Sequence, residues 1–163
     1  GAVEILRDDA DIHFRFIGHG QLYNEIYKQA QNKELSIEFL PWQTEECLNE
    51  LLNDSDIILG IFGDTDKTNR VVPNKVMQGI AVCKPVVTKD TPAIREIFGE
   101  QDLVLVDGSP QSIVDDILRL KRDSQAQQQF TKSAHVVLEQ RLLNSYKSTT
   151  LYEIFSEICS GKK

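Results

Sequence analysis

The segment that most constrains the fold of this chain runs from Asp56 to Thr88. It reads as an apolar run ending at Gly60, a polar loop, a helix opened by Pro73, a tight turn and a second apolar run over Pro85–Thr88. In a parallel sheet, this order brings the loop and the helix N-terminus together at the carboxyl edge. Because backbone amides there lack partners and the helix dipole favours anions, the segment predicts a phosphate-binding site.

The same alternation of strand-like and helix-like segments extends along the chain. Runs of branched apolar residues predict strands over Ile12–Gly18, Ser36–Leu40, Asp56–Ile61, Pro85–Thr88 and Leu103–Asp107. Apolar residues spaced three and four apart predict helices over Gln21–Gln31, Thr44–Asn53, Pro73–Val82 and Pro92–Phe98. Continuous apolar strands are typical of a sheet covered on both faces. The prediction is therefore a doubly wound α/β fold, with at least five mainly parallel strands in one sheet and helices on both faces.

The two ends of the chain differ from this alternation. Three more helices are predicted near the C-terminus, over Pro110–Arg122, Ser124–Leu143 and Ser145–Cys159. Residues 1–163 are therefore expected to form a single domain, with 123–163 as its C-terminal helices. At the start, Ala2–Asp8 reads as the last two turns of a helix with no strand before it. Since a domain of this kind should open with a strand, we expect its first strand–helix unit to be missing.

Composition and charge exclude several classes of function. The net charge of −7 and the lack of a dense basic tract argue against nucleic-acid binding. No apolar run approaches the ~18 residues of a membrane span, and the first twenty residues do not resemble a signal peptide. Cys47, Cys83 and Cys159 are too widely separated for a disulfide framework or a metal site, so we expect reduced cysteines and a cytoplasmic location. No Ser-His-Asp or Cys-His pattern indicates a nucleophile.

Five short motifs occur in register along the chain: Phe16–Gly20, Ile37–Trp42, Asp56–Gly60, Pro73–Gln78 and Ala81–Val87. Together they resemble the retaining glycosyltransferases of the GT-B fold, in the superfamily named glycosyl transferases group 1. The resemblance covers roughly residues 1–122. It implies that the chain is the C-terminal, Rossmann-like half of such an enzyme, which grips the nucleotide-sugar donor. That half would lack its first strand–helix unit.

The resemblance also implies a donor site at the carboxyl edge of the sheet. The glycine turn after the first strand would face the donor, and the backbone after the second strand would frame the base. Amides of the loop from Gly63 to Asn74 would receive the phosphates, and a side chain one helical turn further would hold the ribose hydroxyls. The implied donor-binding residues are Gly18, His19, Gly20, Pro41, Trp42, Gln43, Gly63, Arg70, Asn74, Lys75 and Gln78. No catalytic residue is assigned.

Several of these residues also have a simpler interpretation. His19 could be a solvent-facing turn residue, and Trp42 could cover the edge of the sheet. Arg70 and Lys75 could be solvated surface charges.

The chain departs from the family pattern at three of the matched positions. Gln78 replaces the usual glutamate, so it keeps an acceptor but loses the charge that strengthens a hydrogen bond to ribose. Arg70 stands where many relatives carry the first glutamate of a Glu-x7-Glu pair. Cys83 stands where glycine is usual, and cysteine disfavours the left-handed turn that glycine allows. The residues that clamp the diphosphate in relatives would belong to the missing first unit.

The function implied is transfer of a sugar from a nucleotide-sugar donor to a saccharide or lipid-linked acceptor, as in polysaccharide biosynthesis. The nucleotide sugar is a substrate, and neither a cofactor nor a metal is implied. One alternative is a sugar-nucleotide epimerase of the same fold, although Arg70 and Gln78 replace the paired carboxylates that such enzymes use. Another is a non-enzymatic binding or interaction module, because fold alone does not dictate function.

The resemblance implies partners beyond the donor. Catalysis would need an N-terminal acceptor domain, so this chain alone is expected to be inactive. The full enzyme could associate peripherally with the cytoplasmic face of a membrane. Since a missing strand would leave unpaired edges in the sheet, a homodimer that completes the sheet is a further expectation.

Overall fold

The computed structural model describes residues 1–143, with 141–143 described by their backbone alone, so the predicted helix over 145–159 lies outside the described residues. Within this range the chain forms parallel strands in the predicted places; β4 is shifted by one residue, and the other strands are shorter than their apolar runs. They are β1 (Phe14–Ile17), β2 (Ile37–Leu40), β3 (Ile58–Leu59), β4 (Val86–Lys89) and β5 (Val104–Val106).

The strands form two sheets instead of the single sheet that the sequence predicted. β1 pairs with β2, with Phe14 opposite Ile37, while β3, β4 and β5 form a second sheet in that order. The outer edges of β1 and β3 pair with no strand of residues 1–143. No strand of residues 1–143 lies between β1 and β3 to join the two sheets, as expected for a fold that lacks its first strand. The fold class is nevertheless the expected α/β class.

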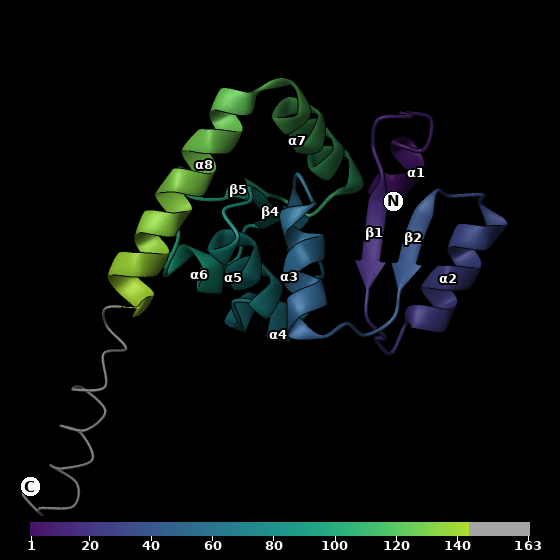
Figure 1. The fold of residues 1–163 in the computed structure, drawn as a ribbon, viewed down its shortest axis with the longest axis horizontal. Helices are drawn as coiled ribbons and strands as arrows, with labels where there is room; N and C mark the ends of the chain where they lie inside the picture. The colour runs from purple at the N-terminus through teal and green to yellow at the C-terminus, as the bar shows by residue number, and fades with distance from the viewer. Residues whose placement is uncertain (144–163) are drawn as a thin grey trace, which may run out of the picture.

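Helices surround both sheets (Figure 1). α3 lies in front of the strands, α2 lies beside β2, and α7 and α8 meet at the end of the molecule that is shown at the top. The bounds are α1 (Ala2–Ile5), α2 (Tyr23–Asn32), α3 (Glu45–Asn53), α4 (Asp66–Arg70), α5 (Asn74–Ala81), α6 (Pro92–Arg95), α7 (Pro110–Arg122) and α8 (Ser124–Val137), followed by the π-helix η1 (Leu138–Leu143). Thr44 and Thr91 cap α3 and α6, because their side chains accept hydrogen bonds from the amides of Cys47 and Ile94.

The apolar core lies on both faces of the β3–β4–β5 sheet. Val86 and Val87 of β4 are 1% and 0% exposed and face opposite sides, as successive residues of a strand do. On one side Val86 packs with α5 and α8, and on the other Val87 packs with α7. Phe14 of β1 joins the second cluster. The two sheets therefore share a core although no hydrogen bond joins their strands.

One glycine allows α5 to lie directly on the sheet, and another allows the chain after β3 to lie directly beside β4. A Cβ at Gly79 would lie 2.8 Å from Val86 Cγ2, and one at Gly60 would lie 2.4 Å from Thr88 Oγ1. Both contacts are closer than real side chains allow, so α5 approaches the sheet only because Gly79 has no side chain, and Gly60 lies against Thr88 for the same reason. This packing fixes the start of α5 near the carboxyl end of β3.

Three local expectations differ from the structure. The loop predicted after β3 contains the short helix α4, which has no apolar periodicity and begins at the cap of Thr65. The helix expected over Ala2–Asp8 is a single turn. Cys83 adopts the left-handed conformation with φ 54°, although the sequence argued against it. The preceding helix ends there with backbone bonds from Cys83 and Lys84 to carbonyls of its last turn, which stabilise the turn.

Candidate functional site

The carboxyl ends of the strands meet at one edge, as the sequence predicted. Gly18 follows β1, Leu40 ends β2, Gly60 follows β3 and Thr88 lies next to last in β4. Figure 1 shows the arrowheads of β1 and β2 at the same, lower edge as α4 and the beginning of α3. In open α/β sheets, ligands bind outside this edge. The predicted site residues fall into two groups along it.

The first group surrounds the turn after β1. Gly18 has φ +97°, and its amide donates to the carbonyl of Leu40 at 2.9 Å, so the turn continues the β1–β2 ladder. A Cβ at Gly18 would lie 3.8 Å from the Trp42 ring, which shows that Trp42 lies over the turn. The Trp42 side chain is otherwise 76% exposed, and Gln43 donates to the carbonyl of Pro41 at 3.0 Å. The structure therefore brings Gly18 and Trp42 together.

His19 and Gly20 complete this group. The His19 ring lies 3.8 Å from the ring of Tyr23 on α2, measured between centroids. Gly20 has open space where a side chain would be, and its carbonyl accepts from the amide of Tyr23 at 3.1 Å. His19 is thus a surface turn residue that packs on α2, while Gly20 leaves room beside the backbone for a ligand.

The second group is centred on the start of α5. Pro73 occupies the cap position, where it offers no capping side chain, and the amides of Asn74 and Lys75 have no acceptor within residues 1–143. The first turn of α5 also contains no acidic residue. Gln78 is exposed on the same face as Asn74, one turn further along. This arrangement suits an anion at the helix start and a neutral hydrogen-bonding group beside it.

Lys75 adds a cation at this helix start. Neighbouring protein atoms partly desolvate its ammonium group and lower its pKa from the usual value of 10.5, although the residue remains exposed. Within the described part of the chain no carboxylate pairs with it. An anion bound at the start of α5 would compensate this desolvation.

Gly63 precedes α4, and Arg70 is its last residue. The carbonyl of Gly63 accepts from the Thr68 hydroxyl at 2.9 Å, and Thr68 is only 7% exposed, so the loop is ordered around this side chain. Arg70 pairs with Asp66 at 3.3 Å, but both side chains are largely exposed. Such a surface pair contributes little to stability, so Arg70 could exchange Asp66 for a phosphate.

The sequence analysis missed Lys89, which lies at the same edge. Its side chain is only 12% exposed, packs close to Gly108 and forms an ion pair with Asp64 in the loop after β3. The signal was available, because Lys89 follows a buried apolar run and the carboxyl edge is where such residues gather. Next to it, Arg95 bonds both oxygens of Asp90 at 2.7 Å and thereby lowers the pKa of that carboxyl group.

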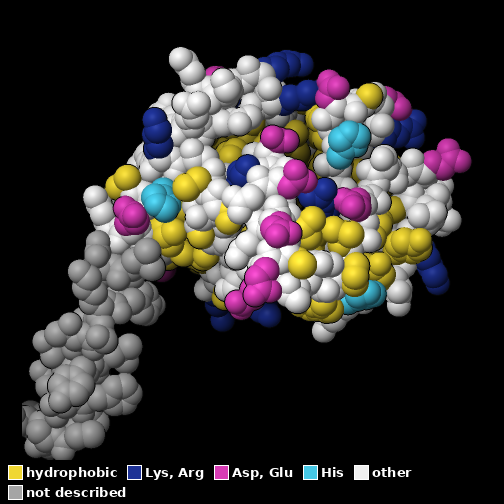
Figure 2. Space-filling view, viewed as in Figure 1, with side chains coloured by type: hydrophobic (Ala, Val, Ile, Leu, Met, Phe, Trp, Pro, Cys, Tyr) yellow, Lys and Arg dark blue, Asp and Glu magenta, His cyan; other side chains and the backbone are white. Residues whose placement is uncertain are grey.

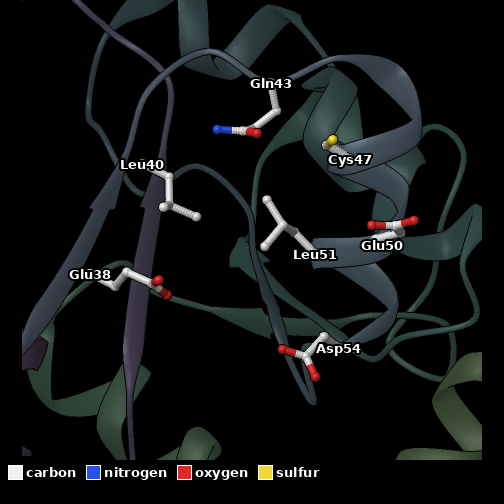
Figure 3. A pocket seen from close by; sticks show the side chains of 7 residues that line it. All are labelled: Glu38, Leu40, Gln43, Cys47, Glu50, Leu51 and Asp54. Carbon is white, nitrogen blue, oxygen red and sulfur yellow. The ribbon is translucent and has the colours of Figure 1, made fainter.

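A cavity of about 430 Å³ lies between β2 and α3 (Figure 3). Gln43 is the single predicted site residue that lines it. Three carboxylates line it as well, and Figure 2 shows further acidic side chains gathered over α3. Arg15 pairs with Glu38 at 2.5 Å and with Asp54 at 3.2 Å, so one cation faces three carboxylates. Since like charges repel, the remaining negative charge makes this cavity a poorer place for a diphosphate than the start of α5. Its lining residues are Glu38, Leu40, Gln43, Cys47, Glu50, Leu51 and Asp54.

Two kinds of feature are absent from the described residues. No group of three or more His, Cys, Asp or Glu side chains in residues 1–143 is arranged to hold a metal ion. In the same range, none of the helices combines the length and the apolar character needed to cross a bilayer.

Solved structures share this fold. TarM from S. aureus superposes with a TM-score of 0.70 at 17% identity, covering 93% of this chain and 30% of TarM. HepE from Anabaena, solved in complex with UDP-glucose, gives 0.74 at 16% identity, covering 99% of this chain and 44% of HepE. The catalytic domain of cholesterol-α-glucosyltransferase from Helicobacter pylori gives 0.64 at 17% identity, covering 85% of each chain. At these identities the likeness establishes the fold, and this chain spans less than half the length of TarM and HepE.

Sequence comparison identifies the family. No curated protein matches the chain. The family model described as glycosyl transferases group 1 matches residues 1–123, which is most of the chain. The chain therefore belongs to the glycosyl transferases group 1 family, and it has the fold of the C-terminal half of a GT-B glycosyltransferase.

Proposed function

We propose that this chain binds the donor of a sugar-transfer reaction, and that the diphosphate of a nucleotide sugar binds at the start of α5. The observation that carries the proposal is the uncapped first turn of α5, where two amides without acceptors adjoin the unpaired ammonium group of Lys75. Anions are stabilised at such a helix start by the amides and by the dipole. The UDP-glucose bound to HepE supports the choice of a nucleotide sugar.

The remaining site residues would orient the rest of the donor. Gln78, one turn along α5, would hydrogen-bond the ribose hydroxyls. The turn after β1 and the backbone of Pro41–Gln43 would frame the base, with the exposed Trp42 ring beside it. Fixing the donor at three places would hold the sugar carbon in one orientation toward the acceptor, which is how positioning accelerates transfer.

Transfer itself would require an acceptor-binding domain. This chain spans 30% of TarM and 44% of HepE, which supports a role as one part of a two-domain enzyme. The acceptor would be a saccharide or a lipid-linked saccharide, as in polysaccharide biosynthesis at the cytoplasmic face of a membrane. This chain alone would bind the donor without transferring sugar. The unpaired edges of β1 and β3 would also permit a dimer that completes the sheet.

The test is titration of the chain with UDP-, GDP- and ADP-sugars by isothermal calorimetry, in parallel with two lysine variants. Lys75→Ala should weaken binding of the preferred donor about ten- to a hundredfold, because it removes one charge-assisted contact of roughly 1.5–3 kcal/mol. Lys84→Ala is the matched control, since Lys84 follows the opposite end of α5, and it should bind as the wild type does. Failure of all three donors to bind, or equal affinity in Lys75→Ala, would contradict the proposal.

A further inference from the structure

A cysteine, a histidine and a glutamate lie in a row at the opposite end of α5 from the candidate donor site. Cys83 follows α5 and is exposed. Its Sγ lies 3.9 Å from Nδ1 of His135 on α8. The other ring nitrogen of His135, Nε2, lies 3.4 Å from Oε1 of Glu139 on η1. No Cys-His pattern is visible in the sequence, because 52 residues separate Cys83 from His135 and only the packing of α5 against α8 and η1 joins them.

The order of the three groups suits proton transfer from the thiol. A carboxylate at Nε2 favours the tautomer in which Nε2 carries the proton, and this tautomer leaves the lone pair of Nδ1 directed at the sulfur of Cys83. Glu139 also stabilises the imidazolium that forms when His135 accepts the thiol proton. Since the thiol and the carboxylate lie on opposite nitrogens of the ring, the groups do not converge on a point between them, as the ligands of a metal would.

We propose that Cys83 is a redox-modification site, oxidised by hydroperoxides to a sulfenic acid with His135 as the general base. The sulfur attacks the terminal oxygen of the hydroperoxide, so an S–O bond forms as the O–O bond breaks. The thiol proton passes to Nδ1 of His135 and from there to the departing oxygen, which leaves as water or an alcohol. The sulfur is oxidised and the hydroperoxide is reduced, so the step needs no other reactant.

Cys47 provides an internal comparison within the same chain. It is also exposed, but no histidine lies in contact with its sulfur, and it lines the acidic cavity together with Glu50. The charged residue next to Cys83 in the chain is instead Lys84, and the Glu139 carboxylate lies beyond the His135 ring. Cations favour a thiolate and carboxylates oppose it. If exposure alone set the rate of oxidation, Cys47 and Cys83 would react equally fast. The contact with His135 should make Cys83 react faster.

The test exposes the chain to hydrogen peroxide at pH 7 with a cyclic 1,3-diketone that traps sulfenic acids, and quantifies each cysteine peptide by mass spectrometry. Cys83 should be trapped at least about tenfold faster than Cys47, as expected for general-base assistance. In His135→Gln the rate at Cys83 should fall to that of Cys47, while the rate at Cys47 stays unchanged and shows that the fold is intact. Equal rates at the two cysteines in the wild type, or a Cys83 rate that His135→Gln does not lower, would overturn the proposal.

Discussion

At the scale of residues, the candidate site depends on a few groups around the start of α5. Lys75 has a pKa lowered by desolvation and no partner in the described chain, so a bound anion would favour its charged form. Gln78 offers a neutral amide where relatives carry a carboxylate. Lys75 and Gln78 could both be predicted as site residues from the sequence, because they lie inside one continuous motif of the family. It could not identify the Cys83–His135 contact, which exists only through packing.

The first prediction concerns Gln78. Replacing Gln78 by Ala removes one neutral hydrogen bond worth ~0.5–1.5 kcal/mol, so donor affinity should fall about two- to tenfold. Gln78→Glu should preserve or improve affinity, because a charged acceptor forms a stronger bond. Calorimetry with the preferred nucleotide sugar measures both changes. Gln128→Ala on α8 serves as the control, and unchanged affinity in both Gln78 variants would rule out the ribose role.

The second prediction concerns the left-handed position at Cys83. A residue with a side chain is strained by roughly 1–2 kcal/mol at φ 54°, whereas glycine is not. Glycine also raises the conformational entropy of the unfolded chain, which offsets part of this gain. Cys83→Gly should therefore raise the free energy of unfolding by about 0.5–1 kcal/mol in urea titrations. Glu34, with φ 52°, is a second position of this kind, so Glu34→Gly should change stability in the same direction. Lower stability in both variants would argue against backbone strain.

At the scale of elements, continuous patterns were predictable and short ones were not. The strands and the long helices were found because apolar runs and three-four spacing extend over several turns or residues. α7 has its predicted bounds, and the face that predicted it, with Ile113, Ile117 and Leu120, is buried. α4 was missed because its five residues, Asp66–Arg70, contain no apolar residue and depend on a cap from Thr65. The break from α helix to π-helix at Leu138 has no local signal that we can identify.

The close packing of α5 on the sheet gives the third prediction. Gly79→Ala would bring a Cβ within 2.8 Å of Val86 Cγ2 and 3.0 Å of Ile58 Cβ. Overpacking costs about 1–3 kcal/mol, and the better helix propensity of Ala offsets about 1 kcal/mol of it. Urea unfolding should therefore show a net loss of about 1 kcal/mol. Gly20→Ala, where no atom lies within 4 Å of the added Cβ, should leave stability nearly unchanged. An equally stable Gly79→Ala would mean that the helix can move away from β4.

At the scale of the whole molecule, the fold class followed from the sequence but the arrangement of the strands did not. The regular alternation of apolar runs and helices predicted a parallel α/β architecture. The expected missing strand predicted unpaired edges, but the individual runs did not show that the edges would belong to β1 and β3, because register and neighbours depend on which strands are available to pair. What joins the two sheets is side-chain packing, in which Phe14 contributes a ring to the core beneath β4 and β5.

The fourth prediction tests that shared core. Phe14 is 8% exposed and packs with the second core cluster, whereas Phe16, two residues along the same face, is 37% exposed. Phe14→Ala should destabilise the chain by about 3–5 kcal/mol, as deletion of a buried ring does. Phe16→Ala should cost less, about 1 kcal/mol, because much of its ring is already in water. Chemical denaturation of both variants gives the comparison. If both substitutions lower the free energy of unfolding by similar amounts, contacts other than those of Phe14 must join β1 and β2 to the rest of the domain.

The central claim is that an anionic donor binds at the start of α5, and amide NMR tests it most directly. The ¹⁵N-labelled chain would be titrated with the nucleotide sugar that binds in calorimetry. The amide chemical shifts of Asn74 and Lys75 should change most, because these groups would donate to the diphosphate. Smaller changes are expected at Gly18 and Gly20. Shifts confined to the acidic cavity between β2 and α3, with the first turn of α5 unaffected, would contradict the account.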